Sequence, residues 1–138
     1  MTLQKPLEET NGTNRSHLLL VEDDTESCEM LRHVLADWDL TLSHTIAGAM
    51  SFYLERHFDL FLLDNWLPDG SGIELCRELR SRYPETPIVF MSAAAHESTI
   101  EQANAAGADR YFVKPFDPYE LRGVVKELLE PSASEVKS

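Results

Sequence analysis

The chain has 138 residues and a formal net charge of −12, from 12 Lys and Arg residues against 24 Asp and Glu residues. A chain of this length forms one domain with a sizeable core. The acidic balance argues against direct binding to nucleic acid, and no apolar run approaches the roughly 18 residues that a membrane span requires. Because the first residues also lack the apolar core of a secretory signal, we expect a cytoplasmic protein that does not contact a membrane.

Two cysteines, Cys28 and Cys76, lie far apart in the sequence and form no C-x-x-C unit. Neither a disulfide framework nor a zinc site is therefore indicated. Each falls within a helical pattern, where small thiols commonly take half-buried positions. The histidines show no ligand spacing, and we assign them no function.

Strand-like and helix-like segments alternate between residues 17 and 130. The predicted strands cover residues 18–22, 39–44, 60–64, 88–91 and 110–113. Apolar residues recur at helical spacing after each strand, from about residue 24, from 45 to about 56, and over 73–81, 97–106 and 117–130. Successive strand–helix units predict an α/β domain with a doubly wound, five-stranded parallel sheet and helices on both faces. The polar ends, residues 1–16 and 131–138, are interpreted as flexible tails, and the second could be a severed linker.

Cap residues indicate where several of these helices begin and end. Asp24, Thr45 and Asp117 can each cap a helix N-terminus, and Gly107 can take the left-handed conformation that ends one. Trp38 continues the apolar spacing of the first helix and is expected to fill the core. The inward face of the last helix is predicted to consist of Leu121, Val124, Val125, Leu128 and Leu129.

Charged side chains follow three of the predicted strands. Asp64 ends the third strand, Glu22 and Asp23 close the first, and Lys114 follows the fifth. Strand ends at one edge of a parallel sheet share a crevice, which is the usual ligand position in such folds. Carboxylates gathered there repel each other by about 4 kcal/mol per pair at an effective dielectric near 20, so a cation is needed to offset them. An oxygen-only ligand set favours Mg²⁺, and Mn²⁺ could substitute.

On these motifs the chain resembles the response-regulator receiver domains of two-component signalling, over about residues 17–130. The matching segments occur in the expected order on the expected elements, and they are Val21-Glu22-Asp23-Asp24, Asp64-Asn65-Trp66-Leu67-Pro68-Asp69-Gly70-Ser71-Gly72, Met91-Ser92-Ala93, Gly107-Ala108-Asp109 and Tyr111-Phe112-Val113-Lys114-Pro115-Phe116. The resemblance implies a flavodoxin-like sheet of order 2-1-3-4-5, which periodicity alone does not give.

The resemblance also implies the chemistry. Asp64 would be the phosphoacceptor, taking a phosphoryl group from a phosphohistidine on a sensor histidine kinase or a histidine phosphotransfer protein. Asp23 and Asp64 would bind Mg²⁺ through their side chains, Trp66 through its backbone carbonyl, and Glu22 through water. Lys114 would pair with the phosphoryl group and Ser92 would hydrogen-bond to it. Such a chain is a signalling protein that catalyses only its own phosphorylation and dephosphorylation.

Three acidic residues occur together after the first strand, so the acidic pair has two possible assignments. Relatives with three acids use the first two, which favours Glu22 with Asp23 and leaves Asp24 to cap the helix. The spacing alone also allows Asp23 with Asp24.

A switch follows from the resemblance as well. Ser92 would move toward the phosphoryl group and Tyr111 would turn inward, which changes the affinity for a downstream protein target. The peptide bond before Pro115 is expected to be cis, which would aim Lys114 at the site.

Two residues depart from the family pattern in a way that concerns water access. Trp66 lies two residues after the acceptor and Ala94 two residues after Ser92, positions that govern how water reaches the acyl phosphate in the family. Neither an indole ring nor a methyl group can orient a water molecule. The hypothesis that follows is a longer phosphoryl lifetime than in relatives with polar residues there.

Alternative functions remain at this point. The chain could be the receiver part of a larger transcription factor or output enzyme, although Val124 stands where DNA-binding dimers of the family typically have Arg. An Asp-nucleophile phosphatase usually has a second Asp where Trp66 stands. A flavodoxin-like electron carrier is disfavoured because no phosphate-binding loop rich in Ser, Thr and Gly follows the first strand.

Overall fold

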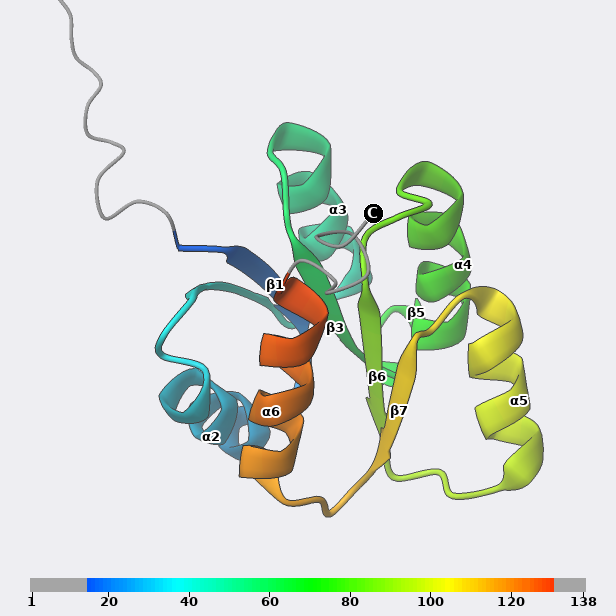
Figure 1. Ribbon diagram of the computed structural model, residues 1–138. Coiled ribbons are helices and arrows are strands. Elements are labelled where there is room, and N and C mark those ends of the chain that lie inside the picture. Colours follow the sequence, from blue (N-terminus) through cyan, green and yellow to red (C-terminus); the bar gives the residue numbers. More distant parts are fainter. Residues whose placement is uncertain (1–14, 131–138) are drawn as a thin grey trace, which may run out of the picture.

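Five parallel strands form the centre of the computed structural model, which describes residues 15–130 (Figure 1). They are β1 (His17–Val21), β2 (Asp39–Ser43), β3 (Leu60–Asp64), β6 (Ile88–Ser92) and β7 (Arg110–Val113). The strands pair in the order β2-β1-β3-β6-β7. Since β4 and β5 belong to a separate hairpin, this is the predicted 2-1-3-4-5 order, and the doubly wound fold is confirmed.

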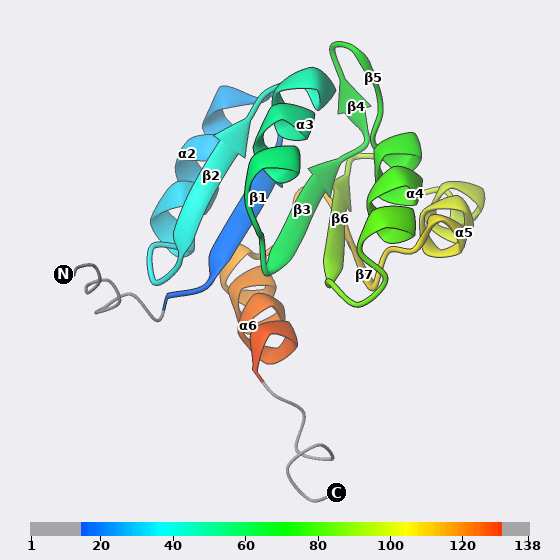
Figure 2. The same ribbon diagram turned by 90° about the horizontal axis from the view of Figure 1, so that it is seen from above.

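Helices cover both faces of this sheet (Figure 2). α2 (Thr25–Val34) and α6 (Pro118–Leu129) pack together on one face, and α3 (Ile46–Glu55), α4 (Gly72–Arg82) and α5 (Glu97–Ala106) cover the other. Asp24, Thr45 and Asp117 accept hydrogen bonds from the first-turn amides of α2, α3 and α6, and Gly107 ends α5 in the left-handed conformation. The predicted caps therefore form.

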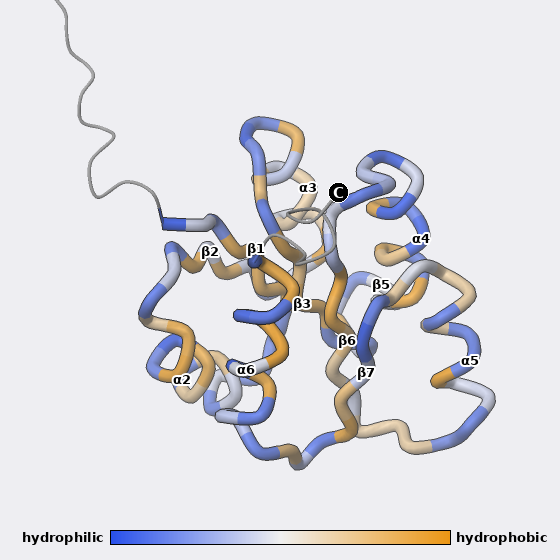
Figure 3. The backbone as a smooth tube through the Cα atoms, in the orientation of Figure 1, coloured by the Kyte–Doolittle hydropathy of each residue, from blue (hydrophilic) through white to orange (hydrophobic). Residues whose placement is uncertain are grey.

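Strand side chains alternate between two separate cores. Leu19 and Leu63 pack with α3, α4 and α5, whereas Leu20 and Leu62 pack with α2 and α6. The apolar colour in Figure 3 accordingly concentrates along the central strands. Residues two apart in a strand point to the same face of the sheet. This alternation therefore determines on which face the side chain at each strand end lies.

One helix boundary and one core assignment need correction. The helix that begins after Asp24 ends at Val34, so Trp38 lies beyond it, where its amide donates to the Leu35 carbonyl; its ring still packs against the α2/α6 core. Val124 is only half-buried and lies outside that core, because α6 directs Leu121 and Val125 inward and leaves Val124 at the edge of the stripe.

A short antiparallel hairpin, β4 (Trp66–Leu67) with β5 (Gly70–Ser71), follows β3 where a loop was predicted. At its turn the Asp69 carboxylate accepts hydrogen bonds from the Ile46 and Ala47 amides, at 2.8 and 3.0 Å. These bonds to the first turn of α3 lower the pKa of Asp69. Two-residue strands carry too little periodicity to be recognised in a sequence.

The predicted tails, residues 1–16 and 131–138, lie almost entirely outside the described residues. Within the first, the Arg15 guanidinium donates to the Ala36 and Trp38 carbonyls, at 2.6 and 3.1 Å. Between residues 15 and 130 no helix has both the length and the apolar character that crossing a membrane takes.

The start of α4 passes directly against the end of β3. A methyl group on Gly72 would lie 2.0 Å from the Asp64 carbonyl oxygen and 2.9 Å from the Asn65 Cα. Gly72→Ala must therefore displace backbone, and we expect it to lower the free energy of unfolding by about 3 kcal/mol. Chemical denaturation measures this change.

The matched control is Gly123→Ala in α6, where an added methyl group meets no atom within 4 Å. It should raise the free energy of unfolding by about 0.5–1 kcal/mol, because alanine is the better helix former. Equal effects of the two substitutions would contradict the close contact at Gly72.

Candidate functional site

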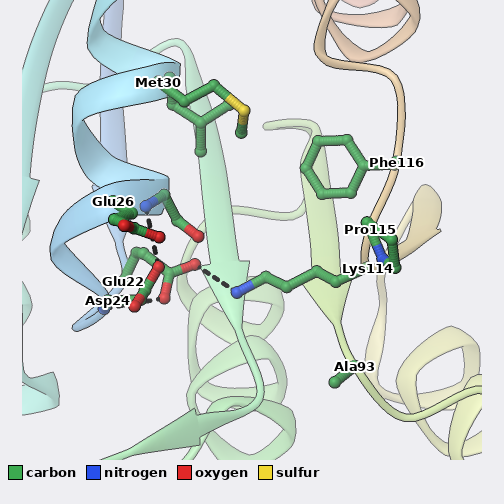
Figure 4. A pocket seen from close by; sticks show the side chains of 10 residues that line it. Glu22, Asp24, Glu26, Met30, Ala93, Lys114, Pro115 and Phe116 are labelled. Atoms are coloured by element: carbon green, nitrogen blue, oxygen red, sulfur yellow. Dashed lines mark hydrogen bonds and ion pairs between the residues drawn. The ribbon is translucent and has the colours of Figure 1, made fainter.

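Glu22, Asp64 and Lys114 meet at one end of the sheet. Each stands two residues after a strand residue of the α2/α6 core, so all three side chains continue the same face. β1 and β3 are adjacent parallel strands, and their register brings Glu22 beside Asp64. Lys114 is the first residue after β7, and its side chain extends toward Glu22 (Figure 4).

The carboxylates form a tight cluster. Glu22, Asp23 and Asp64 each offer one oxygen, and these oxygens all lie within 4.8 Å of one another. Glu22 is fully buried, Asp64 is 6% exposed and Asp23 is exposed. Asp24 is used differently, because its carboxylate accepts from the Ser27 amide at 2.9 Å in the α2 cap. The structure thus groups the first two acids of the run with Asp64.

Lys114 compensates part of this negative charge. Its Nζ lies 2.7 Å from Glu22 Oε1 and 3.7 Å from Asp64 Oδ2, so the direct hydrogen bond is to Glu22 rather than to Asp64. Burial by itself would lower the pKa of Lys114, but the hydrogen bond to Glu22 and the charges of Asp64 and Glu22 outweigh burial and raise the pKa. The ammonium is therefore held in its charged form.

Asp64 is held in an environment that disfavours its charge. Burial and the neighbouring Glu22 carboxylate raise the pKa of Asp64 to about 6, although the Lys114 ammonium and the Asn65 amide work in the opposite direction. That amide donates to Asp64 Oδ1 at 2.7 Å. A carboxylate so placed gains stability from any added positive charge.

The donor chemistry of the cluster suits a hard divalent cation. All its donors are oxygens, and the exposed Asp23 leaves one side open to water, as Mg²⁺ prefers. Both Glu22 oxygens already accept hydrogen bonds, from Lys114 Nζ at 2.7 Å and from the Asp24 amide at 3.1 Å. This fits Glu22 as a ligand that acts through water. The Trp66 carbonyl stays a predicted ligand.

Ser92 and Tyr111 are linked to each other through the β6–α5 loop. Ser92 is fully buried at the end of β6, and its Oγ accepts from the Ala94 amide at 3.1 Å. The Tyr111 hydroxyl donates to the Ala94 carbonyl at 2.8 Å, and its ring stacks on Phe90. Ala94 therefore connects the two predicted switch residues.

Two residues that the sequence did not indicate support the backbone of the acidic pair. The Cys28 thiol donates to the Glu22 carbonyl at 3.3 Å, and His44 Nδ1 lies 3.0 Å from the same oxygen. Burial raises the pKa of Cys28 to about 11, so it stays a neutral donor. Contacts to a backbone carbonyl leave no signal in the sequence, which explains why both residues were missed.

A cavity of about 470 Å³ lies beside the ion pair, between α2 and the β7–α6 loop. Figure 4 shows Lys114 along one side of it and Glu22, Asp24 and Glu26 along another, with Phe116 among the apolar residues. The Lys114–Pro115 peptide bond is cis. Trp66 is 67% exposed, in the hairpin that follows β3.

Comparisons with known proteins agree with this geometry. The model of the family described as "Response regulator receiver domain" matches residues 18–126. The chain is 37% identical over 119 residues to the transcriptional regulatory protein ResD of Bacillus subtilis, covering 85% of this chain and 49% of that protein. It is 40% identical over 126 residues to the phosphate regulon transcriptional regulatory protein PhoB of Rhizobium meliloti, covering 88% of this chain and 55% of that protein.

A solved structure gives the same result for the fold. The CheY-like response regulator receiver domain protein from Methanospirillum hungatei superposes with a TM-score of 0.79 at 26% identity, covering 83% of this chain and 94% of that one. The chain spans about half the length of the curated relatives named above. From the family match and the shared fold, the chain belongs to the response-regulator receiver domain family.

Proposed function

We propose that Asp64 is the phosphoacceptor of this receiver domain and that its phosphorylation switches the affinity for a downstream protein. The observation that supports this most is the cluster of Glu22, Asp23 and Asp64 with the Lys114 ammonium reaching into it. The donor would be a phosphohistidine on a sensor histidine kinase or a histidine phosphotransfer protein, as is usual in the family.

In the proposed transfer, an Asp64 carboxylate oxygen attacks the phosphorus atom, and the phosphorus–nitrogen bond to the donor histidine breaks. The imidazole leaves with the bonding electron pair, and an acyl phosphate remains on Asp64. Lys114 then exchanges its bond to Glu22 for one to a phosphoryl oxygen, which its 3.7 Å distance from Asp64 Oδ2 allows. The contribution of these residues is charge stabilisation and positioning.

A divalent cation belongs to this proposal. Asp23 and Asp64 would hold Mg²⁺ or Mn²⁺ through their side chains, with the Trp66 carbonyl, and with Glu22 acting through water. The bound ion would supply positive charge opposite the phosphoryl oxygens. The part of this chain is to keep the oxygens of the cluster within 4.8 Å of one another.

The switch would run through Ser92. A phosphoryl group adds up to about two negative charges and new acceptor oxygens, toward which the Ser92 hydroxyl can turn. Any movement of Ser92 acts on Ala94 and hence on Tyr111, because Ala94 bonds to both. The surface of α5, β7 and α6 would change with it.

A second reading concerns the whole protein. Because ResD and PhoB are transcriptional regulatory proteins about twice as long as the match, this chain could be the receiver part of a larger regulator or output enzyme. In either case we propose a cytoplasmic receiver that binds neither nucleic acid nor membrane itself, given its net charge of −12, and that turns over no external substrate. The length of the open reading frame distinguishes the two readings.

The direct test is phosphorylation by acetyl phosphate with Mg²⁺. The wild-type protein should gain one phosphoryl group, whereas Asp64→Ala should gain none and removal of Mg²⁺ with EDTA should reduce labelling at least about tenfold. Intact-mass spectrometry measures both. Asp59→Ala is the matched control, since Asp59 is an acidic residue at the opposite end of the sheet. Labelling of Asp64→Ala would overturn the assignment.

The raised pKa of Asp64 predicts a stability effect in the metal-free protein. Between about pH 4 and pH 6 the folded state binds more protons at Asp64 than the unfolded state, so stability falls as the pH rises through this window. Asp64→Asn removes this loss. The free energy of unfolding of this variant should equal that of the wild type near pH 4 and exceed it by roughly 2–3 kcal/mol above pH 7.

Urea denaturation in EDTA at several pH values measures this difference. An advantage for Asp64→Asn that does not change with pH would contradict a raised Asp64 pKa. Added Mg²⁺ should narrow the difference at neutral pH by stabilising the wild-type protein alone.

Because the side chains of Trp66 and Ala94 cannot orient a water molecule, we expect a long-lived phosphorylated state. The double substitution Trp66→Asn with Ala94→Glu introduces groups that can orient a water molecule, and should raise the decay rate constant about tenfold. The loss of phosphoryl label over time measures it. Tyr119→Asn is the control, because Tyr119 is an aromatic residue of similar exposure, 64%, in another part of the molecule. Equal decay rates of wild type and double variant would contradict the hypothesis that Trp66 and Ala94 prolong the lifetime of the phosphorylated state.

A further inference from the structure

Asn65 and Ser92 are neighbours across two adjacent strands. In the β3–β6 ladder Leu63 is opposite Phe90 and Asp64 is opposite Met91, and the two strands lie side by side in Figures 1 and 2. Asn65 is the first residue beyond β3, and Ser92 is the last residue of β6. Both continue the face covered by α3, α4 and α5, because Leu63 and Phe90 pack there.

The polar groups of this pair are complementary and incompletely used. Asn65 is 5% exposed, and its side-chain Oδ1 is buried without a hydrogen-bond partner. Ser92 Oγ accepts from the Ala94 amide, but within residues 15–130 the Ser92 hydroxyl donates to no acceptor. The register of β3 and β6 therefore places a residue with a buried, unpartnered acceptor opposite a residue whose buried hydroxyl has a proton to donate. Buried polar groups rarely remain unpaired.

We propose that Asn65 is a positioning residue that competes with the phosphoryl group for the single proton of the Ser92 hydroxyl. This inference rests on the proposed function, in which Ser92 donates to the phosphoryl group on Asp64. A hydroxyl carries one proton and can donate it to one acceptor at a time. When Asn65 Oδ1 takes that proton, Ser92 is turned away from the acceptor aspartate, and the unphosphorylated arrangement of the β6–α5 loop is favoured.

The competition reaches the rest of the switch through Ala94. Ser92 Oγ accepts from the Ala94 amide at 3.1 Å, and the Ala94 carbonyl accepts from the Tyr111 hydroxyl at 2.8 Å. The Ser92 carbonyl also accepts from the Lys114 amide at 2.8 Å. A rotation of the Ser92 side chain toward Asn65 or toward the phosphoryl group therefore alters one continuous set of bonds. Asn65 sets the balance between the two arrangements although it touches neither Tyr111 nor the phosphoryl group.

The substitution that isolates this role is Asn65→Leu, which keeps the size of the side chain and removes its acceptor. The probe is beryllofluoride with Mg²⁺, a mimic of the phosphoryl group, titrated by calorimetry into the full chain. Loss of the competing acceptor should tighten beryllofluoride binding about three- to tenfold, the worth of one neutral hydrogen bond. In a Ser92→Ala background the same substitution should change the affinity by less than about twofold, because no proton remains to compete for.

The comparison of backgrounds distinguishes competition from packing. An equal change in affinity in both backgrounds, or no change in either, overturns the competition. Asn65→Ala removes the acceptor without adding an apolar side chain, and serves in the same cycle if Asn65→Leu does not fold. If wild type does not bind beryllofluoride at all, the proposed function fails and this inference with it. Normal wild-type binding with an unchanged Asn65→Leu affinity overturns this inference alone.

Discussion

The repulsion among three carboxylates at one sheet edge is the constraint on which the rest of the site depends. Two of them, Glu22 and Asp64, are almost completely removed from water, where charge is most costly. Lys114 offsets part of that cost by bonding to Glu22, so Asp64 is left with the longer contact. The result is a carboxylate that is destabilised as an anion and accessible to positive charge. A divalent cation is the kind of ligand that would meet that need.

Much of this arrangement could be predicted because it follows from periodicity. Asp64 and Lys114 stand where apolar runs stop, and residues at the ends of parallel strands must meet at one edge. The caps at Asp24, Asp117 and Gly107 formed because they depend on neighbours a few residues away. The strand order came from family resemblance, since the winding of a parallel sheet leaves no trace in hydrophobic spacing.

What could not be predicted depends on contacts between distant residues. The sequence suggested that Lys114 faces Asp64, but which of several nearby carboxylates it bonds to is decided by differences of about 1 Å. The hairpin after β3 was missed because its strands are too short to alternate. Val124 was assigned to the core because it fits a helical stripe, yet α6 is rotated so that Leu121 and Val125 fill that space. That Asn65 follows Asp64 opposite Ser92 could be recognised only from the register between β3 and β6.

Asp69 gives the hairpin an importance beyond its size. Its carboxylate closes the amino-terminal end of α3, whose helix dipole places positive partial charge at those amides. The polypeptide that leaves β3 is thereby attached to the first turn of α3, more than twenty positions earlier in the sequence. Any displacement of the turn at Asp69 has to break these two charge-assisted hydrogen bonds or move α3 with it. Through α3, which lies against β2, the turn after β3 is thereby joined to the edge strand at the opposite side of the sheet from β7.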